Sequence, residues 1–192
     1  MDELAEKAGK DPFTFRLQHL NDERAIAVLT RLQELIASIQ TSTNAGIGIA
    51  FSRYKNNGSY CAVAAQVTVH PKENIEVQKM WAVIDSGEVI NIDGLKNQTE
   101  GGLIQSASWT IMEQVQFDAQ RITSRDWFSY PIMRFNQVPE VEVLVLDKPN
   151  EMAMGAGEAA QGPAAAALAN AVYKACGQRI RHLPLLKGMH KI

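Results

Sequence analysis

The spacing of apolar residues changes at Gly46, and this change limits the possible folds more than any other feature of the chain. Downstream of Gly46 lie three segments rich in Val, Ile, Tyr and Trp, with the sequences GIGIAFSRY, SYCAVAAQVTVH and IEVQKMWAVID. Such segments predict three strands of an antiparallel meander. Upstream, apolar residues follow the spacing of one helix face, at Ala25, Val28, Leu29, Leu32, Leu35 and Ile36. We therefore expect a helical segment over residues 1–40, followed by a unit over residues 41–192 that is built around a sheet.

Capping and turn residues place the boundaries of these elements. Asp11 precedes Pro12, which suits the first turn of a helix, and Asp22 is a second candidate N-cap. The helix that follows Asp22 is expected to cover the sheet with its apolar face. Small and polar residues predict a linker and three turns, at residues 40–46, 55–58, 71–74 and 85–87.

The second half of the chain predicts two more helices and one more strand. A helix is expected over Lys96–Gln116, a strand over Val141–Asp147, and a last helix from Pro163 to Gly177, which suits the C′ position. The order helix, meander, helix, strand, helix predicts an α+β fold of mixed α/β layers, with helices packed on a mainly antiparallel sheet. Both later helices should pack against the meander.

Composition argues against several classes of function. The chain has 192 residues, 46% of them hydrophobic, which is enough to bury a core. Its net charge of -2 without a basic patch argues against a nucleic-acid partner. No segment matches a bilayer span or a secretory signal, so cytoplasmic and periplasmic locations both stay open. Cys61, Cys176 and the four histidines show no metal-ligand spacing, so no protein-ligated metal is expected.

The sequence Gly155-Ala156-Gly157-Glu158 lies just before the last predicted helix. Glycines let a backbone turn tightly and approach a ligand closely, and the helix N-terminus that follows offers unpaired N–H groups. A carboxylate placed there tends to stay ionised, as a general base should. An exposed glutamate on a flexible loop is the alternative, and these residues alone favour that alternative.

Two further segments could carry chemistry. Asn97–Gly102 contains two adjacent glycines in a helical pattern, each costing about 1 kcal/mol relative to alanine, which indicates close packing against a backbone or a bulky ligand. Gln98 has the donor and acceptor atoms to bind a heterocyclic ring edge, although a capping amide at a helix start explains it equally well. The aromatics of Trp127–Pro131 could line a pocket for a planar substrate, but such residues more often cover the edge of a core.

In this order, the segments resemble the C-terminal region of the molybdenum-cofactor-binding large subunits of the xanthine dehydrogenase and aldehyde oxidase superfamily. The resemblance is strongest to beta subunits of the nicotinate dehydrogenase and isoquinoline 1-oxidoreductase type. It rests on YCAVAAQVTV, WAVIDSGEVINIDGLKNQTEGG, SRDWFSYPIMRFNQVPEVEVLVLD, GAGEAAQGPAAAALANAV and RIRHLPL. MDELAEKAGKDPFTFRLQHL is similar to an internal stretch of the same subunits, so the resemblance covers nearly the whole chain.

The resemblance implies a molybdenum–molybdopterin cofactor, in some members a cytosine dinucleotide form, whose metal is held by the pterin. Enzymes of this kind hydroxylate an N-heteroaromatic or aldehyde substrate with oxygen derived from water. By the same resemblance, Glu158 is the general base, and Gln98, Gly155 and Gly157 contact the cofactor. Electrons are expected to leave through iron–sulfur clusters on a small partner subunit.

Large subunits of this family are several times longer than the chain, and their N-terminal part supplies more of the cofactor pocket. We therefore expect the chain to be one component of a molybdenum hydroxylase and not to act alone. The alternative is a non-catalytic fragment or assembly partner that binds no cofactor by itself. In isolation, the chain is expected to expose an apolar or glycine-lined surface near Gly101 and Gly155, and therefore to self-associate.

Overall fold

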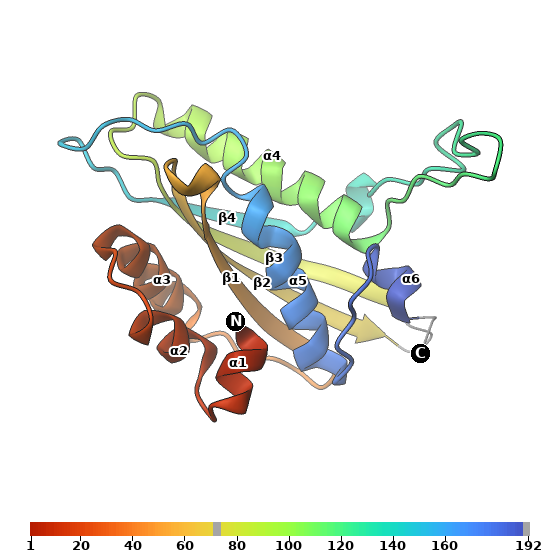
Figure 1. Cartoon of the computed structure of the whole chain (residues 1–192), viewed down its shortest axis with the longest axis horizontal. Coiled ribbons are helices and arrows are strands. Elements are labelled where there is room, and N and C mark those ends of the chain that lie inside the picture. The colour runs from red at the N-terminus through yellow and green to blue at the C-terminus, as the bar shows by residue number, and fades with distance from the viewer. Residues whose placement is uncertain (71–73, 190–192) are drawn as a thin grey trace.

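Four strands form one sheet in the order β1-β2-β3-β4 in the computed structural model, which describes residues 1–70 and 74–189 (Figure 1). The first three strands form the predicted antiparallel meander, and β4 lies parallel to β3. The α+β class with a mainly antiparallel sheet is therefore confirmed. The predicted turn at 71–74 falls mainly on residues outside the described ones. The strand bounds are β1 Ala45–Arg53, β2 Tyr60–His70, β3 Asn74–Asp85 and β4 Glu140–Val145.

Three helices precede the sheet, and the second and third of them begin at the predicted caps. The Asp11 carboxylate accepts hydrogen bonds from the amides of Phe13 and Thr14 at 2.9 and 3.0 Å. The Asp22 carboxylate accepts from the amides of Arg24 and Ala25 in the same way, at 3.0 and 3.3 Å. Each cap satisfies helix N–H groups that would otherwise lack a partner. The three helices are α1 Asp2–Lys7, α2 Pro12–Gln18 and α3 Glu23–Ile36.

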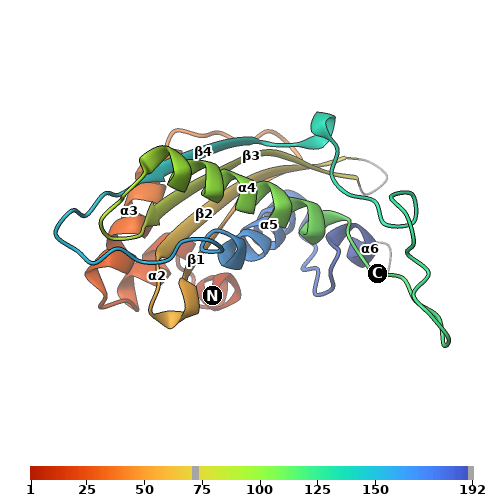
Figure 2. The ribbon, with the colours of Figure 1, turned by 90° about the horizontal axis from the view of Figure 1, so that it is seen from above.

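Strand β2 is buried on both of its faces, because helices cover the sheet on both sides (Figure 2). Alternate side chains of a strand point to opposite faces. Tyr60, Ala62 and Ala64 accordingly join a core with the apolar face of α3, as the sequence predicts. Cys61 and Val63 join the core formed with α4 (Ile92–Ile111) and α5 (Gln161–Cys176). Both later helices thus pack on the sheet as expected.

Helix α5 lies unusually close to β1, and two glycines allow this. A Cβ at Gly46 would lie 2.4 Å from the carbonyl oxygen of Ala171, and one at Gly48 would lie 2.2 Å from that of Ala167. Backbone atoms cannot yield to such a contact, so the strand needs glycine at both positions. The helix ends as predicted at Gly177, which adopts the left-handed conformation with φ of 74°.

The prediction for α4 was wrong at both ends, since the helix spans Ile92–Ile111 and not Lys96–Gln116. The start lies earlier because the Asn91 side chain caps it by accepting a hydrogen bond from the amide of Gly94 at 2.8 Å. The end lies earlier because the backbone leaves helical geometry at Met112, where φ is -137°, and further along the amide of Gln116 donates to the Ser124 hydroxyl at 2.7 Å and not to a helix carbonyl.

The remaining elements are small. Strand β4 ends at Val145, so its last two predicted residues lie outside the regular pairing, although the amide of Leu146 still donates to the Ile84 carbonyl at 2.8 Å. No helix among the described residues is both long and apolar enough to cross a bilayer. Two single-turn 3-10 helices and one short α-helix complete the fold, η1 Tyr54–Asn56, η2 Phe135–Gln137 and α6 Leu185–Met189.

Candidate functional site

The glycine loop, residues 153–160, joins the region after β4 to helix α5 and is held at its base by the sheet. The amide of Met154 donates to the Ser86 carbonyl at 2.8 Å, and the Ser59 hydroxyl donates to the Gly155 carbonyl at 2.9 Å. Ser59 and Ser86 follow the η1 turn and β3 respectively, and both are buried. The loop is therefore anchored to the end of the sheet at which β2 begins and β3 ends.

The structure brings together two of the three segments that the sequence singled out. The Gln98 side-chain amide donates to the carbonyl of Gly157 at 2.7 Å, so helix α4 is tied directly to the glycine loop. Gln98 is exposed, and its amide oxygen has no hydrogen-bond partner among the described residues. The third segment, around Trp127, follows the C-terminal end of α4 and does not join them.

Glu158 is exposed, and its carboxylate is held by a residue that the sequence analysis missed. The Tyr54 hydroxyl donates to Glu158 Oε2 at 2.6 Å, across 104 positions of sequence. The ammonium of Lys55 lies 5.1 Å from the centre of the Tyr54 ring. Tyr54, and more weakly Glu158, raise the pKa of Lys55 above its usual value. The sequence marked 55–58 only as a turn, and nothing in its pattern indicated that this turn faces Glu158.

Three glycines near this site leave open space beside the backbone. A Cβ at Gly101, Gly155 or Gly157 would meet no heavy atom within 4 Å. The neighbouring Gly102 is in ordinary contact with the Gln161 side chain, at 3.5 Å. For the Gly101-Gly102 pair, the sequence predicted close packing against a backbone or a bulky ligand, and the first of these two explanations does not hold within the described residues. The backbone is open to a group from outside the chain.

A turn after β3 supports the base of the loop through a buried ion pair. The Asp85 carboxylate is fully buried and accepts hydrogen bonds from the Arg24 guanidinium at 2.9 and 2.5 Å and from the amide of Gly87 at 2.9 Å. Gly87 has φ of 76°, and a Cβ there would lie 2.1 Å from the carbonyl oxygen of Met152. Helix α3, the turn and the loop therefore form one connected structure.

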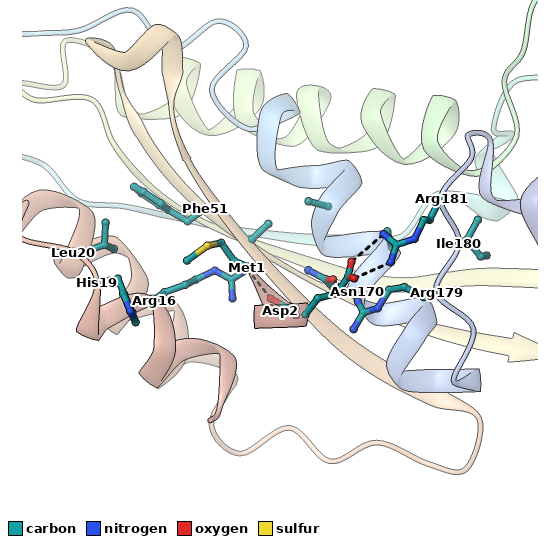
Figure 3. A pocket seen from close by; sticks show the side chains of 14 residues that line it. Met1, Asp2, Arg16, His19, Leu20, Phe51, Asn170, Arg179, Ile180 and Arg181 are labelled. Carbon is teal, nitrogen blue, oxygen red and sulfur yellow. Dashed lines mark hydrogen bonds and ion pairs between the residues drawn. The ribbon is translucent and has the colours of Figure 1, made fainter. Parts of the chain in front are cut away.

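A separate cavity of about 380 Å³ lies between α2, β1, α5 and the C-terminal segment (Figure 3). Its arginines are neutralised by carboxylates at the start of the chain. Arg16 and Asp2 form a buried pair at 2.6 Å, and Arg181 donates to both oxygens of Glu3 at 3.1 and 2.7 Å. The cavity therefore offers no unpaired cation among these residues, and it does not include the glycine loop.

Comparison with known proteins places the chain in a family. Residues 23–139 match the model of the molybdopterin cofactor-binding domain. The chain belongs to this family, within the xanthine dehydrogenase group of proteins. The matched stretch contains Gln98 and ends before Gly155, so the glycine loop lies outside it.

Longer relatives match almost the whole chain. It is 35% identical to a nicotinate dehydrogenase subunit of Pseudomonas putida and 32% identical to the beta subunit of isoquinoline 1-oxidoreductase of Brevundimonas diminuta, over 96% of its length in both cases. These matches span only 17% and 24% of the two relatives. The chain therefore spans about a sixth of the length of the first relative and about a quarter of the second.

Solved structures show the same fold within larger chains. Quinoline 2-oxidoreductase of Pseudomonas putida 86 superimposes with a TM-score of 0.63 at 24% identity, over 69% of this chain and 18% of that one. The aldehyde oxidoreductase of Desulfovibrio desulfuricans has a TM-score of 0.55 at 28% identity, over 66% of this chain and 14% of that one.

Among the described residues, no group of three or more His, Cys, Asp or Glu side chains could hold a metal ion.

Proposed function

We propose that this chain is one component of a molybdenum hydroxylase that oxidises an N-heteroaromatic or aldehyde substrate with oxygen derived from water. The observation that carries the proposal is the junction of Gln98 with the glycine loop, in a chain of the molybdopterin-binding family. The named relatives act on nicotinate and isoquinoline, and others are aldehyde oxidoreductases, which supports these two substrate classes.

The residues at this junction fit a pterin cofactor. Gly155 and Gly157 present an open backbone at which an added Cβ would occupy free space, so a planar group can approach the main chain directly. Gln98 donates its amide N–H to Gly157 and keeps its amide oxygen for a donor on the ligand. The pterin, which some family members extend to a cytosine dinucleotide form, carries the metal, so the chain need not supply metal ligands.

The bound molybdenum cofactor supplies oxygen transfer and two-electron redox chemistry. The role proposed for this chain is to hold and move a proton at Glu158 Oε2. The Tyr54 hydroxyl already orients this carboxylate, and the loop carries it beside the open glycine backbone. Proton transfer by a positioned carboxylate contributes about 10²–10⁴-fold to a rate.

Glu158 and Gln98 are exposed in this chain, whereas electrostatic catalysis depends on excluding water. We therefore infer that the rest of the large subunit covers the glycine loop and excludes water from it. A small subunit with iron–sulfur clusters would then accept the electrons. We also propose that the chain divides into two parts. Residues 1–40 form a helical segment, and residues 41–192 form a cofactor-binding part.

The test is molybdenum and pterin content of the assembly purified from its native host, for the parent chain and two variants. Glu158→Gln should keep the metal and lose at least about 100-fold in turnover, because it removes only the basic group. Gly157→Val should lower the molybdenum content while the fold of the isolated chain is unchanged, because the new side chain meets free space within the chain.

A matched control is Glu34→Gln, which removes a carboxylate from the exposed face of α3, where Glu34 pairs with Arg31. This change should leave both metal content and turnover as in the parent. A native assembly without molybdenum or pterin would favour the non-catalytic assembly partner. Parent turnover in fully loaded Glu158→Gln would refute the assigned base.

A further inference from the structure

The segment between α4 and β4, residues 113–139, projects from the body of the molecule and is called the arm here (Figures 1 and 2). Phe128 and Phe135 are essentially fully exposed, at 97% and 101%, and Trp127 is 70% exposed. Burying an aromatic side chain removes 150–250 Å² from water, so these three expose roughly 500 Å². Exposed apolar area on this scale, gathered on one segment, is typical of interaction sites. Other exposed apolar residues of the arm are Val115, Phe117, Ile122 and Ile132.

Local hydrogen bonds fix the aromatic turn in this exposed position. The Asp126 carboxylate accepts from the amides of Phe128 and Ser129 at 3.1 and 2.8 Å. At the base, the Tyr130 hydroxyl donates to Glu113 at 2.8 Å. A surface that is ordered before it binds loses less conformational entropy on binding. The exposed aromatics are therefore held in place without a partner for their side chains.

Part of the arm and the side of α4 line an open apolar groove of about 630 Å³. Ile104 of α4 forms one wall, and Trp127 and Phe135 form part of the other. Arg134 is its charged lining residue. A groove of this size and composition is suited to apolar side chains of another polypeptide.

The arm carries no net charge. Its three arginines, Arg121, Arg125 and Arg134, are matched in number by three carboxylates, those of Glu113, Asp118 and Asp126. Within residues 1–70 and 74–189, none of these six side chains forms an ion pair. A surface with charges of both signs around an apolar centre would complement this arrangement.

We propose that the arm is the docking surface for the rest of the large subunit, whose contact face is apolar at its centre and carries charges of both signs around it. The relatives argue for this occupant, because 96% of the chain matches a stretch that makes up only 17% or 24% of their length. In those proteins the remaining polypeptide is part of the same chain. The inference rests on the proposed function for the identity of the partner.

The exposed apolar area of the arm is consistent with a docking surface. One side of a stable interface buries about 800 Å², of which the arm aromatics alone would supply more than half. Aromatic residues at the centre of an interface commonly contribute about thirtyfold or more each to affinity. Replacing three of them should therefore weaken the complex by more than 100-fold.

The experiment co-produces the tagged chain with a probe, the nicotinate dehydrogenase subunit of Pseudomonas putida from which the stretch matching this chain has been removed. We expect a soluble complex with the parent chain. The triple variant Trp127→Ser, Phe128→Ser, Phe135→Ser should bind the probe with a Kd more than 100-fold higher, measured by titration of the purified partners. Its circular dichroism should match the parent, because these side chains are exposed.

The control variant Leu4→Ser, Leu183→Ser changes two side chains that are 54% and 55% exposed outside the arm, and it should capture the probe as the parent does. Capture by the triple variant at the parent level would overturn the proposal, as would no soluble complex with the parent. An arm-dependent dimer of the chain that excludes the probe would make a second copy the occupant instead. A captured complex without molybdenum would leave the docking surface in place and count against the proposed function alone.

Discussion

The ion pair between Arg24 and Asp85 should be the most sensitive point of the support beneath the glycine loop. Asp85 is completely buried, and two of its three hydrogen bonds come from the Arg24 guanidinium. The Arg24 side chain is itself only 21% exposed. Arg24 also lies 3.5 Å from Glu151, on the segment that leads to the loop. The pair thus joins α3 to the turn after β3 and to the loop.

Arg24→Met keeps the length of the side chain and leaves the Asp85 carboxylate buried without its cation. Removing one partner of a buried pair costs about 3–5 kcal/mol, and the partial exposure of Arg24 puts the expected loss near 3 kcal/mol. In a chain of this size each kcal/mol lowers Tm by about 2–4 °C, so Tm should fall by about 6–12 °C. The measurement is thermal unfolding followed by circular dichroism.

Arg31→Met is the matched control, because Arg31 lies on the same helix and also pairs with a carboxylate, that of Glu34, at 2.7 Å. Both partners are more than half exposed, at 52% and 56%, so the expected loss is below about 1 kcal/mol. Equal Tm values for Arg24→Met and Arg31→Met would refute the claim that burial of Asp85 makes its ion pair with Arg24 the stronger of the two.

Two further predictions concern the fold. Gly48→Ala would bring its Cβ to 2.2 Å from the Ala167 oxygen, so the free energy of unfolding in urea should fall by about 1–3 kcal/mol. Gly157→Ala is the control and should leave this free energy unchanged, because its Cβ meets free space. An unchanged urea midpoint for Gly48→Ala would show that α5 can move away from β1. Burial raises the pKa of Asp22, but hydrogen bonds from Tyr60 and from helix amides outweigh burial and hold that pKa below its usual value. The folded pKa therefore lies below the unfolded value of about 3.9, so the stabilisation is present above about pH 4 and is lost as pH falls through the folded pKa. Stability measured at pH 5 and pH 3 should differ less for Asp22→Asn than for the parent, and equal differences would contradict this assignment.

The fold could be predicted from the sequence wherever a local pattern determines structure. The change of period at Gly46 correctly separated helices from strands, and the Asp11 and Asp22 side chains cap their helices as expected. The contact of β1 with α5 could not be predicted, because it depends on two backbones that are far apart in sequence. Gly46 and Gly48 were therefore recognised only as strand residues, although close approach is the reason for them.

The candidate site shows the same division. The motifs containing Gln98 and Glu158 could be found from local composition and resemblance, and the structure joins the first of them to Gly157 by a hydrogen bond. The contacts of Tyr54 with Glu158 and of Ser59 with Gly155 could not be found, because long-range pairing creates them. The predicted end of α4 was also wrong, since the backbone leaves helical geometry at Met112 and Gln116 binds Ser124, neither of which a helical pattern encodes.

Helix α4 relates the two proposals to each other. Gln98 lies near its beginning, and the arm follows its last residue, Ile111. At 1.5 Å per residue the two points are roughly 20 Å apart along the helix. A polypeptide that docks on the arm therefore needs to follow α4 for this distance before it can cover the glycine loop. The arm, at the C-terminal end of α4, would supply the affinity for the docked polypeptide, and water would be excluded at the glycine loop, beside Gln98. Substitutions in the arm should therefore weaken assembly without altering the geometry around Glu158.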